Sequence, residues 1–152
     1  MFVLTAKVSK TKLAAIVTLV IALVVAVAVL LASRNEGPAS DGADTNEGRL
    51  AFLSGFGWEV SAEPTETQSV TVPTEDSEVF SRYNELQKSQ GYDLTQFAGK
   101  TLTRYVYEVL NYPNATEPVY ATLFVSEGRV VGGDITNSAP EGTMHGFRQP
   151  KS

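Results

Sequence analysis

The residue types that do most enzyme and metal chemistry are scarce in this sequence. His145 is the only histidine and there is no cysteine, so the nitrogen and sulfur ligands from which zinc sites are built are missing. A Ser-His-Asp hydrolase would have to use His145 with an acid such as Asp134, and no G-x-S-x-G turn presents a serine nucleophile. Paired carboxylates for glycoside hydrolysis are defined by their separation in the fold, and no particular pair stands out. We predict no catalytic residue, no metal ligand and no cofactor.

Tyrosines make a better case for binding than for catalysis. All six lie between residues 83 and 120, and an aromatic ring with a polar tip suits the binding of a peptide or a glycan. The alternative is that they only pack, because tyrosine is also common in strands. The candidate binding surface consists of Tyr105, Tyr107, Asp134 and His145.

Two adjacent glycines, Gly132 and Gly133, precede Asp134 inside an expected strand. Glycines in a strand mark a bulge or the close approach of another chain segment. We expect a bulge packed under Trp58 or Tyr83. The alternative is a shallow groove, opened by the missing side chains, with Asp134 at its rim.

An apolar run near the N-terminus determines on which side of a membrane the rest of the chain would lie. From Leu13 to Leu31 only Thr18 is not apolar, and these 19 residues would span about 28 Å as a helix, close to the thickness of a bilayer core. Lysines lie before the run and acids after it, so the positive-inside rule places residues 1–12 in the cytoplasm. A cleaved signal peptide is the alternative, but its apolar core is shorter. We expect a single-pass anchor over residues 13–32.

The remaining chain divides into a linker, residues 33–45, and one extracytoplasmic domain, residues 46–150. The linker contains Gly, Pro, Ser, Asp and Asn and almost no large apolar group. Beyond the apolar run there are nine Lys and Arg and 17 Asp and Glu, a net charge of −8. That charge argues against nucleic acid as a partner and against an anionic membrane surface. It also keeps a small domain soluble.

Capping residues predict two helices and a single further turn. Thr45 is a suitable N-cap for a helix that Gly55 and Gly57 end. A second helix is expected over Glu75–Gln90, capped by Thr74 and stopped by Gly91. Its apolar stripe is expected to comprise Val79, Phe80, Tyr83, Leu86 and Gln90. Asp93 is expected to cap one more turn.

Alternating and β-branched residues predict the strands. Two short ones are expected at Trp58–Ser61 and Gln68–Val72, able to pair as a hairpin, and a three-stranded antiparallel meander at Lys100–Asn111, Val119–Val125 and Arg129–Ile135. The aliphatic face of the middle strand should meet the second helix. Arg104 and Glu108 share a strand face, so an ion pair between them is expected. The fold class is α+β, with an amphipathic helix on an antiparallel sheet.

Five sequence segments resemble a known family. From Gly57 onward they are GWEV, SRYNELQKSQGYDL, AGKTLTRYVYEVLNYP, VYATLFVSEGRVVGGDI and GTMHGF. In this order they resemble a family of bacterial single-pass exported proteins catalogued as domain of unknown function 4830. The resemblance implies an anchored extracytoplasmic domain and carries no activity, cofactor or site residue.

The leading functional hypothesis is a membrane-anchored domain that binds an envelope protein or a glycan outside the cytoplasm. A regulator or inhibitor of an envelope peptidase is the alternative, on the analogy of small exported modules with a similar fold. An envelope hydrolase is a further class, which would need a pocket with converging polar groups. An unpaired strand edge would instead favour binding.

Overall fold

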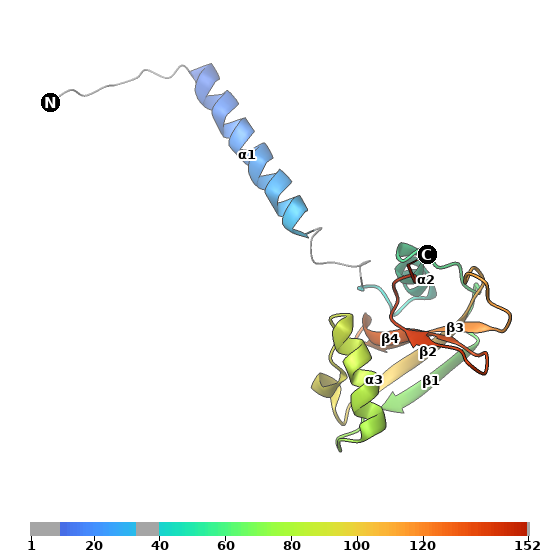
Figure 1. Ribbon diagram of the computed structural model, residues 1–152. Coiled ribbons are helices and arrows are strands. Elements are labelled where there is room, and N and C mark those ends of the chain that lie inside the picture. The colour runs from blue at the N-terminus through green and yellow to red at the C-terminus, as the bar shows by residue number, and fades with distance from the viewer. Residues whose placement is uncertain (1–9, 33–39, 152) are drawn as a thin grey trace. The chain divides into compact units, whose positions relative to one another are not determined.

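A computed structural model describes residues 10–32 and 40–151 of the chain, which forms two units, residues 1–36 and 37–152 (Figure 1). The described residues of the first unit form helix α1 (Lys10–Ala32). Counting only the residues that the structure describes, no helix is both long enough and apolar enough to cross a membrane.

The second unit is an α+β domain built on one antiparallel sheet. Its five strands follow one another in the sheet in chain order, β1 (Glu66–Thr71), β2 (Thr101–Val109), β3 (Val119–Ser126), β4 (Arg129–Asn137) and β5 (Met144–His145). The expected meander is therefore confirmed as β2–β3–β4. The expected hairpin is wrong, because Gln68–Val72 falls largely in β1, which pairs with β2, and the segment Trp58–Ser61 makes only an isolated bridge from Val60 to Val109.

Helix α2 (Asn46–Gly55) begins and ends where its sequence indicates. The Thr45 hydroxyl accepts a hydrogen bond from the Gly48 N–H at 3.0 Å, which satisfies one of the unpaired donors of the first turn. After the last turn, the N–H groups of Phe56 and Gly57 return to carbonyls of the helix, and Gly57 adopts a φ of +86°. The inner side of α2 buries Arg49, Phe52 and Leu53.

Helix α3 (Glu78–Ser89) starts later than expected, and its inward side includes two amides that the sequence did not predict there. Ser77, not Thr74, caps it by accepting a hydrogen bond from the Phe80 N–H. Val79 is 81% exposed, whereas the amide side chains of Asn84 and Gln87 are buried. Of the expected stripe, Phe80, Tyr83, Leu86 and Gln90 are partly buried and only Val79 is exposed. The two amides, Asn84 and Gln87, are buried more deeply than any of these. A short turn, η1 (Leu94–Phe97), follows and is capped by Asp93 as expected.

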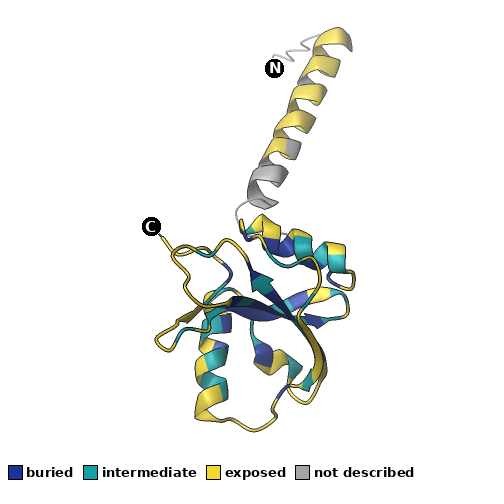
Figure 2. Cartoon of the chain, turned by 90° about the vertical axis from the view of Figure 1, so that its right-hand side faces the viewer, coloured by how far each residue is buried: buried dark blue, intermediate teal, exposed yellow. Residues whose placement is uncertain are grey.

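Helices α2 and α3 cover opposite faces of the sheet (Figure 2). Side chains of alternate β3 residues, Val119, Ala121, Leu123 and Val125, pack in the larger core with Phe52 and Leu53 of α2. Phe124, which points the other way, packs with Phe80 and Tyr83 of α3 in a smaller core. The aliphatic face of the middle strand therefore meets α2, and the expectation that it meets α3 is wrong.

The domain begins earlier than the expected boundary at residue 46. Residues 33–39 of the expected linker lie outside the described part of the chain. Residues 40–45, in contrast, belong to the domain, since the Val130 N–H donates to the Ser40 carbonyl at 3.1 Å and the Ala43 N–H to the Gly128 carbonyl at 2.8 Å. Ala43 is buried, and Asp41 pairs with Arg129 at 2.7 Å.

Candidate functional site

The four residues selected from the sequence lie in three separate places. Tyr107 is 0% exposed. Its hydroxyl accepts a hydrogen bond from Arg49 Nε at 2.8 Å and donates one to Asn46 Oδ1 at 2.7 Å. Burial raises the pKa of Tyr107. Tyr107 therefore belongs to the core and is not available on a binding surface.

Tyr105 is half-buried beside Tyr107 and supports the same arginine. The Arg49 guanidinium lies 3.7 Å from the centre of the Tyr105 ring, and its Nη1 donates to the carbonyls of Ala43 and Asp44. A buried cation is held here by a ring face, a hydroxyl and two carbonyls. Arg49, held by the two tyrosines, thus connects the backbone of residues 43 and 44 to the core.

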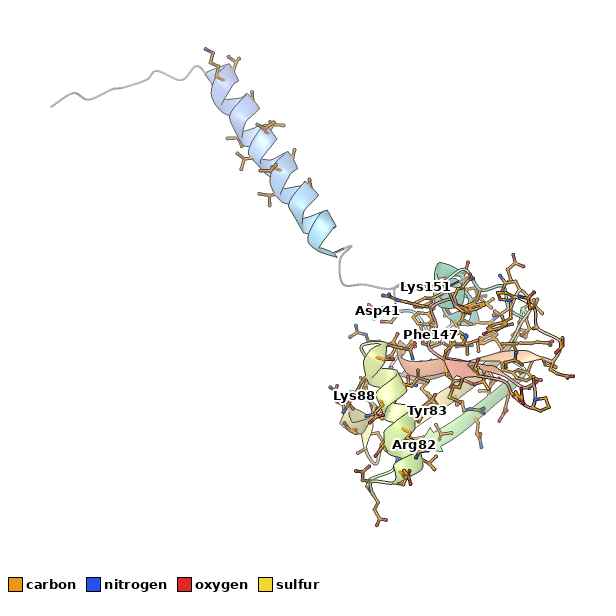
Figure 3. The ribbon with its side chains drawn as sticks, viewed as in Figure 1. Asp41, Arg82, Tyr83, Lys88, Phe147 and Lys151 are labelled. Carbon is orange, nitrogen blue, oxygen red and sulfur yellow. The ribbon has the colours of Figure 1, made fainter. Side chains whose placement is uncertain are left out.

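Asp134 lies between the sheet and α3 rather than at the rim of a groove. It is 4% exposed, and its carboxylate accepts hydrogen bonds at 2.6 Å from the hydroxyls of Tyr83 and Thr136. Burial raises the pKa of Asp134, although the two hydroxyl donors oppose that shift. In Figure 3, Tyr83 projects from α3 toward the sheet.

The glycines before Asp134 are explained by close contacts. The pairing of β3 with β4 shifts between Phe124, opposite Gly132, and Val125, opposite Val130, so the irregularity falls at Val131, one residue before the two glycines. A Cβ on Gly132 would lie 3.0 Å from Gln87 Oε1 and one on Gly133 would lie 2.1 Å from the Thr122 carbonyl oxygen. The space that side chains would take at these two positions is filled by neighbouring atoms, so no groove opens there.

Two glutamines at the end of α3 bind the backbone of Gly133: Gln90, which belongs to the expected stripe, and Gln87, which the sequence did not single out. The buried Gln87 Oε1 accepts from the Gly133 N–H at 2.8 Å, and Gln90 Nε2 donates to the Gly133 carbonyl at 3.0 Å. Gln90 Oε1 also accepts from the Phe147 N–H at 2.8 Å. Gln90 thus uses both its donor and its acceptor, whereas Gln87 contributes its acceptor to Gly133.

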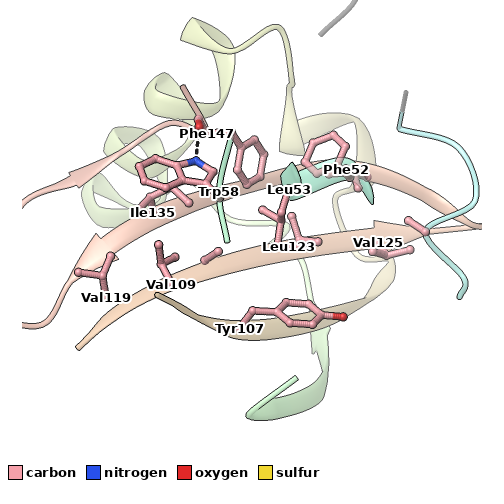
Figure 4. Packing of buried hydrophobic residues seen from close by; sticks show 13 residues of the cluster. Phe52, Leu53, Trp58, Tyr107, Val109, Val119, Leu123, Val125, Ile135 and Phe147 are labelled. Carbon is pink, nitrogen blue, oxygen red and sulfur yellow. Dashed lines mark hydrogen bonds between the residues drawn. The ribbon is translucent and has the colours of Figure 1, made fainter. Parts of the chain in front are cut away.

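His145 belongs to an aromatic group on the tail. Its Nε2 lies 3.0 Å from the Tyr112 hydroxyl and its Nδ1 lies 2.6 Å from the Gly146 carbonyl oxygen. The Tyr112 ring stacks on Trp58 with centroids 5.6 Å apart, and the Trp58 indole N–H donates to the Phe147 carbonyl at 2.6 Å (Figure 4). His145 and Asp134 thus have different hydrogen-bond partners and form no catalytic pair. Within residues 10–32 and 40–151, no three His, Cys, Asp or Glu side chains are grouped so as to hold a metal ion.

One cleft of the domain has side chains of both charges in its lining. It has a volume of about 630 Å³ and lies between the end of α3, η1 and the β3–β4 turn, where Tyr92, Phe97, Lys88 and Arg129 line it. Arg129 is paired with Asp41. Asp93 also lines the cleft. Hydrogen bonds from Thr95 and Asn84 stabilise its carboxylate and lower its pKa to about 2. Glu127 from the β3–β4 turn adds a second acid, so the lining carries two cations and two acids.

Strand β1 forms one edge of the sheet. It lies at the outer edge, next to β2 only (Figure 1), and five of its six residues are exposed. The Val72 N–H, which continues the β1 register, donates to the Lys100 carbonyl at 3.0 Å. Because hydrogen-bonded and open pairs alternate in an antiparallel ladder, the N–H and C=O groups of Thr67, Ser69 and Thr71 point away from β2. No described residue forms a backbone hydrogen bond with these groups.

One ion pair flanks this edge. Arg104 Nη1 on β2 lies 2.9 Å from Glu66 Oε1 on β1, so the expected pairing of Arg104 with Glu108 is wrong. The nearer partner comes from the adjacent strand, whose position the sequence did not predict. The opposite edge differs, because β5 pairs with β4 there through Ile135 and Thr136.

Asp134→Asn should change how stability depends on pH. The raised pKa of Asp134 means that the folded state binds its proton more tightly than the unfolded state, so the free energy of unfolding falls as pH rises from about 4 to the folded pKa. Asparagine does not ionise, and the variant should therefore gain stability relative to the wild type between pH 4 and pH 7. Urea denaturation at several pH values measures this difference, and Glu141→Gln, at an exposed position, is the control. A difference that stays constant over this range would contradict the assignment.

A family model agrees with the resemblance in the sequence. The model described as Domain of unknown function (DUF4830) matches residues 52–135, which is more than half of the chain and includes all of the sheet except β5 and the end of β4. No curated protein and no solved structure matches the chain.

Proposed function

This chain belongs to the family described as domain of unknown function DUF4830, and from that premise we propose that it is a membrane-anchored interaction domain, displayed outside the cytoplasm, that binds other proteins at the edge of β1. The observation that carries the proposal is the unpaired backbone of Thr67, Ser69 and Thr71. The partners are proteins of the cell envelope.

The anchor is supported by the sequence of the first unit. Leu13–Leu31 contains no charged residue, and charges are what a bilayer core tolerates least. In α1 the side chains of Leu19, Ile21, Leu23 and Val24 are all exposed, an apolar surface that lipid would cover. Lys7, Lys10 and Lys12 precede the run, which favours an N-terminus in the cytoplasm and a domain outside it.

The interaction is supported by the lack of protection on β1. Natural edge strands are commonly guarded by lysine, by proline, by a bulge or by a covering segment. The strand itself, ETQSVT, contains neither lysine nor proline, and its six pairs with β2 run in regular register. An extended segment of another chain could therefore add to it, with backbone hydrogen bonds supplying affinity.

The other functional classes have less support. An aromatic surface for glycans loses Tyr107 to the core, and a Ser-His-Asp hydrolase would need Asp134 and His145 to share hydrogen bonds that they make with other residues. Peptidase inhibition through β1 would use the same edge and is one form that the proposed interaction could take.

Single-cysteine variants test the proposal, since the chain has no cysteine of its own. In intact cells a membrane-impermeant maleimide should label Ser69→Cys and Glu141→Cys in the full chain but label Thr5→Cys only after lysis. An impermeant photoactivatable maleimide should then crosslink another envelope protein at Ser69→Cys and not at Glu141→Cys, which is exposed but far along the chain from β1.

Each readout can fail separately. Labelling of Thr5→Cys in intact cells, with Ser69→Cys protected, would reverse the topology. Crosslinks of equal yield at both outer positions would mean that β1 is not the preferred contact.

A further inference from the structure

The chain around β1 has an unusual charge. Between Arg49 and Arg82 there are six acidic residues and no Lys, Arg or His; the acids are Glu59, Glu63, Glu66, Glu75, Asp76 and Glu78. Strand β1 lies in the middle of this stretch, with Glu63 and Glu66 at its start and Glu75 and Asp76 after its end. The one cation on the neighbouring strand at this edge, Arg104, is already paired with Glu66.

The acids at the start of the strand are open to a partner. Glu66 uses Oε1 for Arg104, and its other carboxylate oxygen has no hydrogen-bond partner among the described residues. Glu108 lies on the same face of β2, two residues beyond Val106, the register partner of Glu66. Such diagonal neighbours are about 7–8 Å apart. A positive side chain on a strand added to β1 would therefore lie next to the Glu66 carboxylate, while Arg104 and Glu108 lie one strand farther away on β2.

A second copy of the chain fits this edge poorly. Each copy carries a charge of −8 beyond the apolar run, and pairing two β1 strands would bring both acidic stretches together. Like charges at an interface oppose association. Charge complementarity instead favours a different chain with a positive segment.

We propose that the strand accepted by β1 is an extended segment of another protein that carries Lys or Arg at alternate positions. This inference rests on the proposed function of the β1 edge. Successive side chains of the added strand point to opposite faces of the sheet. On the α3 side, they lie beside Glu66 and Gln68, which suit basic groups, and at the far end beside the half-buried Val70. On the other side they lie beside Thr67, Ser69 and Thr71, which suit small or β-branched residues.

Three labelled peptides test the inference by fluorescence anisotropy with the full chain in detergent. The first is a nine-residue peptide in which Lys alternates with Val and Thr, the second has Gln in place of every Lys, and the third has Glu. At low salt the lysine peptide should bind roughly tenfold more tightly than the glutamine peptide, and this ratio should shrink as salt screens the charges. The glutamate peptide should bind most weakly.

Variants place the binding at the strand. Ser69→Pro removes an N–H that points away from β2 and so should block addition while keeping the β1–β2 ladder; Thr67→Pro does the same at a second position, and Ser69→Ala is the matched control. Glu66→Gln should reduce the affinity for the lysine peptide several-fold without affecting the glutamine peptide. Glu141→Gln removes the same charge elsewhere and should change neither. Thermal unfolding establishes that each variant is folded.

The outcomes separate the partner from the site. If the lysine and glutamine peptides bind equally and both are lost in the proline variants, the basic partner is overturned while the edge remains a binding site. If no peptide binds, the edge itself is overturned. Binding of the lysine peptide that survives both proline substitutions would mean adsorption elsewhere on an acidic surface, and concentration-dependent dimers abolished by Ser69→Pro would mean that a second copy occupies the edge. Either result would overturn the inference.

Discussion

Phe147→Ala should lower the free energy of unfolding of the domain by about 3–5 kcal/mol, the range for removing a large aromatic side chain from a core. Phe147 is 1% exposed, and its ring packs edge-on against Phe52 and Tyr92 with centroids 5.1 and 6.3 Å away. A third ring, Phe56, lies 5.5 Å away. Alanine would leave these rings facing a cavity that the sheet cannot close.

Thermal and urea unfolding of the full chain in detergent measure this loss. The midpoint temperature should fall by roughly 12–30 °C, given the usual scaling for a domain of this size. Met144→Ala, a few residues earlier at an exposed position, is the control and should stay within about 0.5 kcal/mol of the wild type. If the two substitutions had similar effects, the tail would not be part of the core.

This prediction also concerns the extent of the domain. The family model ends at residue 135, whereas the tail supplies Phe147 to the core and β5 to the sheet. The Phe147 backbone is held from two sides, by Trp58 at its carbonyl and by Gln90 at its N–H. The folding unit therefore extends beyond the matched residues at its C-terminal end.

Gly133→Ala should destabilise the domain by about 3 kcal/mol or more, at the upper end of overpacking effects. The added Cβ would lie 2.1 Å from the Thr122 carbonyl oxygen and 2.4 Å from Phe147 Cζ. The carbonyl belongs to the neighbouring strand, so it cannot move aside without opening the β3–β4 pairing. Gly133 also has a φ of +156°, which side chains rarely adopt.

Gly91→Ala provides the comparison for this substitution. Gly91 has a φ of +90° and no atom within 4 Å of an added Cβ, so alanine there should cost only the backbone strain, about 1–2 kcal/mol. Urea denaturation of both variants measures the contribution of the clash as the difference between them. Equal losses would show that β3 and β4 are not as closely paired as described.

Local sequence signals predicted the elements whose ends they mark. Thr45 and Gly57 bound α2, and Asp93 caps η1, because each uses its own side chain or backbone freedom on atoms only a few residues away. The meander followed from alternating residues and from the tight turn at Glu127 and Gly128. These interactions join residues only a few positions apart, so the sequence of the segment itself is enough to predict them.

Predictions that needed a distant partner were less successful. The period of α3 was recognised, but the burial of Gln87 and Asn84 was not. Their side-chain oxygens accept hydrogen bonds from the backbone N–H groups of Gly133 and Leu94, which come from other parts of the chain. Arg104 pairs with Glu66 because β1 adds to β2, not because of its own strand neighbours. Tyr107 can be buried because its hydroxyl accepts a hydrogen bond from Arg49, which lies 58 positions earlier in the chain.

The sequence by itself determined the apolar run, the acidic balance of the remaining chain and the types and order of most elements, because composition and periodicity are properties of continuous segments. Only the tertiary structure decided that α2 covers the aliphatic face of β3, that Tyr107 and Asp134 lie inside, and that β1 is left with an unpaired edge. A pattern states that a face must be covered, but which segment covers it depends on contacts between residues far apart in the chain, and these exist only after folding.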